Sequence, residues 1–230
     1  MLHHVKERSE ARRLTDVLRA ASERSERITD RNPLEERAAT LQMVLEGGVM
    51  RQRFLGDGRR QTVAVYYRDD VINLMGYIGT PQGNSDYLVA LHGSVVGYVA
   101  DAAVQQMRAM APAGRDGVAV LVYRELGIAQ QRITCLGLRS AIEQMAHFLC
   151  ETLIRCGRPG SDYKVDRCSL HMTQEMLSSV LGLSTVHVNR TLMQLRRLKL
   201  ADLVHHELIV HDFDGLAELG EFDDSYLAPI

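Results

Sequence analysis

The chain has 230 residues, of which 46% are hydrophobic and 24% are charged, and its formal net charge at pH 7 is −2. This length suits one large domain or two small ones, and the apolar content excludes an intrinsically disordered chain. The near-neutral balance excludes nucleic-acid binding through overall charge alone, so a basic surface would have to be local.

The N-terminal residues and the cysteines indicate the cellular compartment of the protein. The sequence MLHHVKERSEARR is polar and lacks the apolar core of a signal peptide, and no apolar run is long enough to span a bilayer. The spacings of Cys135, Cys150, Cys156 and Cys168 match no CxxC metal pattern. We therefore expect a cytoplasmic protein with reduced thiols and without a membrane partner.

The first predicted element is an amphipathic helix within residues 5–27. Helix-forming and charged residues fill this segment, and its thin apolar stripe consists of Leu14, Val17, Leu18 and Ala21.

From Leu41 the pattern changes to short apolar runs separated by turn residues. Asp57-Gly58 lies between two such runs and predicts a hairpin, because both residues tolerate positive φ. Similar runs continue around Gly93, and this regular spacing predicts an all-β roll or barrel.

Residues 124–156 return to a helical pattern whose apolar positions alternate in steps of four and three. Such a heptad pattern is typical of a parallel dimer seam, although one long helix packed on the β roll remains an alternative. The residues assigned to the dimer interface are Cys135, Leu138, Ile142, Met145, Leu149 and Thr152.

A hinge and a helix-turn-helix follow. Residues 156–166 are rich in glycine and proline and indicate a linker. Thr173 is a plausible N-cap of a first short helix, Gly182 permits the left-handed backbone that ends it, and Ser184 caps a second helix. Two helices joined by a few residues with a central glycine are typical of a helix-turn-helix.

The second helix, up to Leu200, has two different faces. Val188, Leu192 and Leu195 share the side that we expect to be core. The opposite face contains methyl groups beside arginine, which suits the edges of DNA bases, and no acid occurs between Ser184 and Leu200. The residues of this face are Thr185, Val186, Asn189, Arg190, Met193 and Arg197.

Two strand-like runs around His205-His206-Glu207 then predict a wing, and an acidic tail over residues 212–224 must face away from phosphates.

The order of β roll, heptad helix, hinge and winged helix-turn-helix resembles the Crp/Fnr family of bacterial transcription regulators. The likeness covers roughly residues 40–225, and it is strongest in TQEMLSSVLGLSTVHVNRTLMQLRRLKL. The resemblance implies a homodimer that places two recognition helices in successive major grooves of a palindromic site. It also implies an effector-binding roll and adds RNA polymerase to the candidate partners.

By position, the resemblance makes Arg190 the base-reading arginine, and it makes Thr173 and His187 phosphate contacts. The two residues after the capping serine commonly include arginine and glutamate in the family, whereas this chain has Thr185 and Val186. The half-site should therefore differ from the best-known one.

The effector side departs further from the family. Asn84-Ser85 stands where cyclic-nucleotide-binding members have Arg-Ser, and Ile72-Asn73-Leu74 stands where they have Phe-Gly-Glu. A buried phosphate would lack its counter-charge, so we do not expect cyclic nucleotide dependence. No cysteine precedes Cys135, which argues against an iron–sulfur cluster. No cofactor is predicted, and a pocket for an unidentified small effector would lie near Asn73, Asn84 and Ser85.

Candidate metal-binding and catalytic residues give weaker signals in this sequence. Adjacent histidines, as in His3-His4 and His205-His206, point to different sides of an element and make poor joint metal ligands. No nucleophile, base and orienting group form a catalytic pattern, so we do not expect an enzyme.

The sequence thus predicts an α+β protein with an N-terminal antiparallel β roll, a long dimerisation helix and a C-terminal winged helix-turn-helix. The expected divisions are residues 1–123, 124–157 and 158–230. The expected function is sequence-specific binding of double-stranded DNA as a homodimer. The alternative is a small-molecule- or metal-binding β-roll protein whose C-terminal helices serve association.

Overall fold

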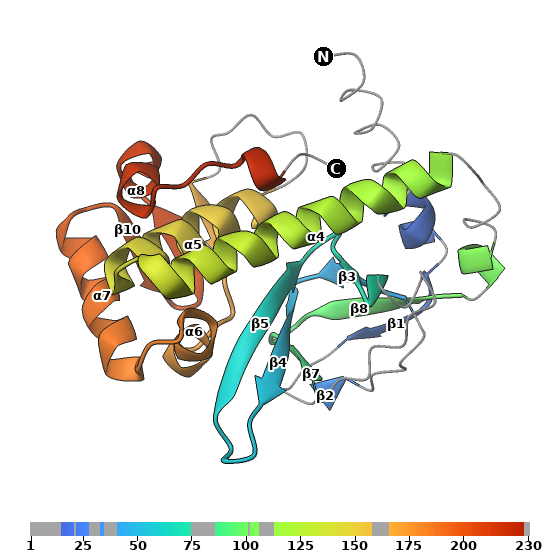
Figure 1. Cartoon of the computed structure of the whole chain (residues 1–230), viewed down its shortest axis with the longest axis horizontal. Helices are drawn as coiled ribbons and strands as arrows, with labels where there is room; N and C mark the ends of the chain where they lie inside the picture. Colours follow the sequence, from blue (N-terminus) through green and yellow to red (C-terminus); the bar gives the residue numbers. More distant parts are fainter. Residues whose placement is uncertain are drawn as a thin grey trace. The chain divides into compact units, whose positions relative to one another are not determined.

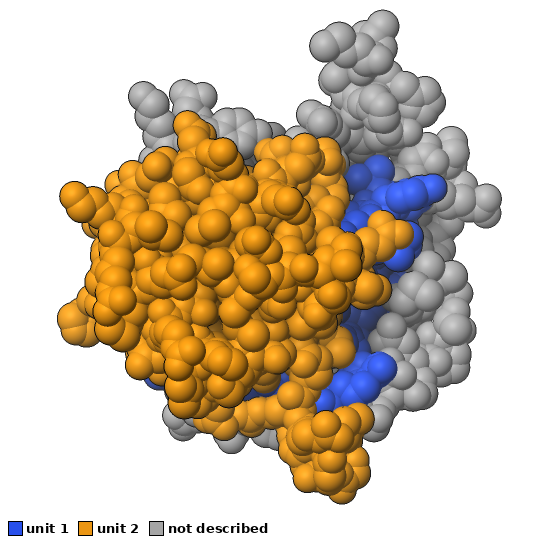
Figure 2. All heavy atoms as spheres, turned by 60° about the vertical axis from the view of Figure 1, so that its left-hand side comes forward, with its two compact units in different colours: residues 1–53, 65–128, 227–230 blue, residues 54–64, 129–226 orange. Residues whose placement is uncertain are grey.

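The computed structural model describes residues 15–20, 22–27, 33–34, 41–74, 86–100, 102–105, 113–157 and 166–227 (Figure 1). The chain divides into two compact units, coloured separately in Figure 2. Unit 1 comprises residues 1–53, 65–128 and 227–230, and unit 2 comprises residues 54–64 and 129–226. The mixed fold, with antiparallel strands first and a helix-turn-helix last, confirms the predicted class.

Unit 1 is built on two four-stranded antiparallel sheets, with strand orders β1-β8-β3-β6 and β2-β7-β4-β5. The strands are β1 (Ser22–Arg27), β2 (Pro33–Leu34), β3 (Gln42–Glu46), β4 (Gly48–Phe54), β5 (Arg60–Tyr67), β6 (Val71–Ile72), β7 (Asp86–Ala90) and β8 (Val95–Val99). Buried apolar residues from β3, β6 and β8 join Leu18, Val118 and Leu121 in one core. Each of these strands thus contributes to a single apolar core, which is what the predicted roll requires.

The N-terminal helix is shorter than predicted. Residues 15–20 are helical, but Ser22–Arg27 form strand β1, which pairs antiparallel with β8. Leu18 is buried in the core while Val17 is exposed. Pairing with β8 satisfies the backbone of a segment whose local composition favours a helix, so tertiary contacts override propensity here. The remainder of the predicted helix lies outside the described residues.

The hairpin predicted at Asp57-Gly58 is present between β4 and β5. Gly58 has a φ of 84°, and the amide of Leu55 donates to the carbonyl of Arg59 at 2.8 Å. Asp57 stabilises the turn by accepting from the amide of Arg59 at 3.0 Å.

The predicted dimerisation helix consists of two helices with different bounds. Helix α4 (Ala113–Leu138) begins earlier than expected, and α5 (Ala141–Cys156) follows after a break at Arg139 and Ser140. The break is encoded by a capping box, in which the amide of Ser140 donates to the carboxylate of Glu143 at 2.7 Å.

Unit 2 contains the rest of α4 and the C-terminal elements. These are α5, β9 (Arg167–Ser169), α6 (Gln174–Leu181), α7 (Thr185–Arg197), β10 (Ala201–Val204), β11 (Glu207–Val210), α8 (Phe213–Gly220) and the 3₁₀ turn η1 (Ser225–Leu227), whose last residue falls in unit 1. Strands β10, β11 and β9 form a three-stranded antiparallel sheet in that order. Helix α5 packs against α6, α7 and α8. Within the described ranges, no helix is long and apolar enough to cross a membrane.

A glycine permits the close packing of α8 on α5. A Cβ atom on Gly220 would lie 2.5 Å from the backbone nitrogen of His147, which no side chain could accommodate. The same contact places the carbonyl of Gly220 3.1 Å from Nδ1 of His147, where it accepts a hydrogen bond.

Candidate DNA-binding surface

Helices α6 and α7 form the predicted helix-turn-helix, and each begins at the predicted cap. The hydroxyl of Thr173 accepts from the amide of Met176, and the hydroxyl of Ser184 accepts from the amide of His187, both at 3.2 Å. Gly182 ends α6 with a φ of 64°, in the left-handed region that glycine adopts without strain. These three residues set the turn between the helices.

Helix α7 has a buried face and an exposed face. Val188, Thr191 and Leu195 are buried, and Leu192 is half-buried. Every residue that the sequence assigned to the outer face is exposed, namely Thr185, Val186, Asn189, Arg190, Met193 and Arg197. His187, which the resemblance makes a phosphate contact, is exposed as well. Val186 is 66% exposed and Met193 46% exposed, which is unusual for apolar side chains on a face that meets only water.

The basic residues of α7 fall into two groups. Arg196 forms an ion pair with Asp202 on β10, and Nε2 of His211 lies 3.1 Å from the other carboxylate oxygen of Asp202. Hydrogen bonds from Arg196 and His211 lower the pKa of the Asp202 carboxyl against the opposing effect of burial. Arg190 and Arg197 form no ion pair within the described ranges, so their charges face outward. The sequence did not single out Asp202, which connects α7 to the wing.

The predicted wing is the hairpin of β10 and β11. Val204 pairs with Glu207, so His205 and His206 are the two loop residues, and their φ values are 50° and 66°. Positive φ at both central positions is the pattern of a type I′ turn, whose twist matches that of the strands. The ring of His206 lies 5.6 Å from that of His171, measured between centroids. The two wing histidines are exposed.

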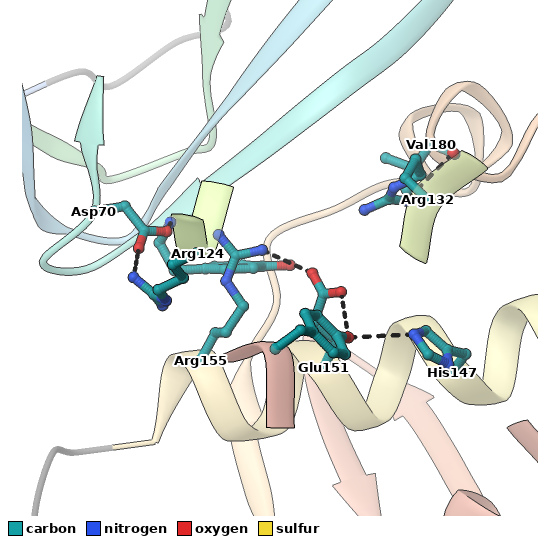
Figure 3. Close-up of polar contacts among 9 residues, drawn as sticks. Asp70, Arg124, Arg132, His147, Glu151, Arg155 and Val180 are labelled. Atoms are coloured by element: carbon teal, nitrogen blue, oxygen red, sulfur yellow. Dashed lines mark hydrogen bonds and ion pairs between the residues drawn. The ribbon is translucent and has the colours of Figure 1, made fainter. Parts of the chain in front are cut away.

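A buried polar network lies on α5 (Figure 3). Glu151 accepts from Arg155 at 2.7 Å and from the hydroxyl of Tyr226 at 2.8 Å. Burial opposes ionisation of Glu151, but Arg155, Arg132 and Tyr226 outweigh it and lower the pKa of the carboxyl. Nε2 of His147 lies 3.2 Å from the same Tyr226 hydroxyl. The network ties α5 to the segment that follows α8.

The residues assigned to a dimer seam do not form one exposed surface. Cys135, Met145, Leu149 and Thr152 are buried within a single chain, and Ile142 is half-buried. Leu138 is 86% exposed but lies on α4, ahead of the break at Arg139 and Ser140. Four of the six residues therefore pack within one chain, in which α5 contacts α6, α7 and α8, and the dimer seam stays a prediction.

Of the three residues assigned to an effector pocket, Asn84 and Ser85 lie outside the described residues. Asn73 is buried with a φ of 64°, and its side-chain oxygen accepts from Nη2 of Arg51 at 2.7 Å. Nε of Arg51 also donates to the hydroxyl of Tyr66 at 3.3 Å. The side-chain nitrogen of Asn73 has no hydrogen-bond partner among the described residues.

Metal ligands and reactive thiols do not gather in the described part of the chain. No group of three or more histidine, cysteine, aspartate or glutamate residues there is placed to hold a metal ion. Burial raises the pKa of the Cys150 thiol to about 12, and it also raises the pKa of the Cys135 thiol. Both thiols therefore resist ionisation at neutral pH.

Comparison with known proteins shows what this part of the chain is similar to. Residues 143–219 match the Crp-like helix-turn-helix domain. The chain is 27% identical over 191 residues to the transcriptional activatory protein AadR of Rhodopseudomonas palustris, covering 80% of this chain and 75% of that protein.

Solved structures show the same fold. FixK2 from Bradyrhizobium japonicum superposes with a TM-score of 0.71 at 21% identity, covering 85% of this chain and 96% of FixK2. A CRP family transcriptional regulator from Thermus thermophilus gives a TM-score of 0.63 at 19% identity, with the same coverage of both chains.

The matched residues 143–219 include α6, α7 and the wing, and the antiparallel sheets of unit 1 precede them in the chain. Residues 143–219 thus carry a Crp-like helix-turn-helix domain, and the chain as a whole is similar to the transcriptional activatory protein AadR and shares its fold with FixK2.

Proposed function

We propose that the chain acts as a homodimer that reads a palindromic DNA site, with one half-site for each α7. The observation that carries this proposal is the outer face of α7, where exposed Val186 and Met193 flank Arg190, which has no ion-pair partner among the described residues. Apolar side chains beside an available guanidinium suit the major groove, where thymine presents a methyl group and guanine presents two acceptors.

Each residue of the surface has a role in this proposal. Arg190 reads a guanine, Val186 packs on a thymine methyl, and Asn189 and Thr185 contact neighbouring bases or phosphates. Met193 adds apolar contact, and Arg197 neutralises a phosphate. Thr173, Ser184 and His187 lie at or near the N-terminal ends of α6 and α7, where free amide groups favour an anion.

The experiment is site selection on random DNA, followed by binding of Arg190→Ala and Arg197→Ala to the selected site and its single-base variants. Arg190→Ala should cost about 1–3 kcal/mol and remove the preference at one base pair in each half-site. Arg197→Ala should weaken binding by a similar factor on every sequence and reduce the salt dependence. Equal losses on all sequences for Arg190→Ala would make Arg190 a phosphate contact. Absence of any selected site would contradict the proposal.

For the dimer we propose a different surface from the predicted seam, which we call the α4 stripe. Its residues follow steps of four and three along one face of α4, and all are exposed: Ala119, Tyr123, Leu126, Gln130, Ile133 and Gly137. Tyr123 is 76% exposed, Leu126 51% and Ile133 70%. Large apolar side chains in a heptad pattern on an open helix face favour pairing with the same face of a second copy.

Regulation is proposed to be independent of cyclic nucleotides, with residues 1–123 serving as the effector-type part and residues 158–230 as the DNA-binding part. The side-chain nitrogen of Asn73, which lacks a described partner, supports a remodelled polar site near Arg51. The name of AadR supports activation of transcription, for which we propose RNA polymerase as a partner and the cytoplasm as the compartment. Titration calorimetry with cyclic AMP and cyclic GMP tests the proposed independence from cyclic nucleotides. Binding of either nucleotide at micromolar concentration would contradict it.

A further inference from the structure

The β4–β5 hairpin contacts the first helix of the helix-turn-helix, although more than a hundred residues separate them in the sequence. Residues 54–64 of this hairpin belong to unit 2 together with α6 and α7, while the same two strands continue into unit 1. Three consecutive residues of β5, namely Arg60, Gln61 and Thr62, make the contact.

The first contact is an ion pair on the surface. Nη2 of Arg60 donates to Oε1 of Glu175 at 2.5 Å, and Glu175 lies in the first turn of α6. Surface pairs contribute little to stability alone, but this one fixes the N-terminal end of α6.

The second contact is buried. The hydroxyl groups of Thr62 and Ser179 lie 2.7 Å apart, and both residues are buried. The Ser179 hydroxyl has a single hydrogen, which it donates to the carbonyl of Met176 at 2.8 Å, so Thr62 is the donor to Ser179. A hydrogen bond between two buried hydroxyls is costly to break from one side only.

The third contact is at the C-terminal end of α6. The carbonyl of Val180 is one of the last-turn carbonyls that have no partner within the helix. It accepts from Nε2 of Gln61 at 3.3 Å and from Nη1 of Arg132 on α4 at 3.4 Å (Figure 3). The hairpin therefore holds α6 at its first turn through Glu175 and at its last turn through Ser179 and Val180.

We infer that the β4–β5 hairpin is a positioning element for DNA recognition, which fixes α6 through Arg60, Gln61 and Thr62 and thereby orients α7. Helix α6 packs directly on α7, so a tilt of α6 would move the outer face of α7 relative to the bases. This inference rests on the proposed function, because it concerns how the proposed base-reading face is held.

The test compares Arg60→Glu, Glu175→Arg and the charge swap that combines both, using affinity for the selected site and for random DNA. Each single reversal should weaken binding to the selected site by roughly 5-fold and leave binding to random DNA nearly unchanged. The swap should restore most of the loss, because it re-forms the ion pair with opposite polarity.

Arg59→Glu is the matched control. Arg59 carries the same charge on the same hairpin, but its Nε pairs with Asp57 within the turn at 2.7 Å and its side chain is exposed. If Arg59→Glu weakened binding as much as Arg60→Glu, or if the swap failed to rescue, the hairpin would act through its charge on DNA and the inference would be wrong.

A second pair of variants tests the buried contact. Thr62→Val should reduce the ratio of selected-site to random-DNA affinity roughly 5-fold, because Ser179 loses its donor, and adding Ser179→Ala should cause less than the summed loss. Equal effects on both DNAs, tracking a fall in melting temperature alone, would overturn positioning. Failure of the wild-type chain to select a site would instead contradict the proposed function itself.

Discussion

Single residues of unit 2 determine how its helices meet. Gly182 allows the turn between α6 and α7, and Gly220 allows α8 to approach the backbone of His147. His147 is buried, its Nδ1 donates to the Gly220 carbonyl at 3.1 Å, and its Nε2 lies 3.2 Å from the Tyr226 hydroxyl. A titratable ring at this contact makes the stability of the DNA-binding unit depend on pH.

The pH dependence follows from the state of His147. Burial, with the nearby charge of Arg139, lowers the pKa of His147 below its ordinary value of 6.5. The unfolded chain therefore binds this proton more readily than the folded chain. The stability contribution is complete above about pH 6.5 and falls as the pH decreases below it, with a slope of at most about 1.4 kcal/mol per pH unit.

Urea unfolding between pH 5 and pH 8 measures this effect. The wild-type chain should lose stability below about pH 6.5, and His147→Asn should be less stable at pH 8 but show a flatter profile. His187→Gln is the control, because His187 is exposed on α7 and should leave the profile unchanged. A wild-type profile that is flat from pH 5 to 8 would show that His147 does not titrate differently in the two states.

At the scale of elements, the wing combines a favourable turn geometry with unfavourable residues. Non-glycine residues in the left-handed region cost roughly 1–2 kcal/mol each, and both loop positions of the wing are histidines. The opposing contribution is the ring contact between His171 and His206, and contacts of this kind are worth about 1 kcal/mol. The backbone strain should therefore outweigh the ring contact.

Replacing the loop by His205→Asn and His206→Gly tests this balance. The free energy of unfolding of the double variant should exceed that of the wild type by about 1 kcal/mol, because Asn-Gly is the preferred pair for a type I′ turn. Thermal unfolding of the wild type and of the double variant at pH 8 measures this difference in stability. A lower melting temperature for the variant would mean that the ring contact, and not the backbone, dominates the energy of the wing.

Local signals in the sequence predicted the elements that local chemistry determines. Thr173, Gly182 and Ser184 were sufficient to locate α6 and α7, because caps and left-handed glycines act within a few residues. The heptad pattern in α5 left two interpretations open, since the same spacing serves packing within one chain and packing between two. Strand β1 was missed because its pairing with β8 lies far away in the sequence.

At the scale of the whole molecule, contacts between distant segments are the part that the sequence could not supply. No sequence pattern around Thr62 or Ser179 indicates that their hydroxyl groups form a hydrogen bond. The α4 stripe contains Ala119, Gln130 and Gly137 between its large apolar residues, which weakens its apolar pattern. Exposure identifies the stripe, because different faces of α4 bury Leu121 and leave Ile133 exposed. The surface left open by the fold is the one available to a second copy.

The stripe therefore predicts which substitutions separate a dimer into monomers. Leu126→Glu with Ile133→Glu places carboxylates where the two copies would meet, and burying unpaired charges should weaken association by at least roughly 100-fold. Sedimentation equilibrium on the wild type and the variant measures this loss. Because the proposed dimer presents one α7 to each half-site, the variant should also lose its preference for two half-sites over one.

Leu138→Glu is the matched control, since Leu138 is exposed near the end of α4 but lies off the stripe. It introduces the same charge on the same helix and should leave the dimer intact. If Leu138→Glu separated the copies while the stripe variant did not, the dimer would form around the end of α4, as the sequence pattern first indicated. If neither did, association would use a surface other than α4, and the spacing of the two half-sites would then have to be derived from that surface.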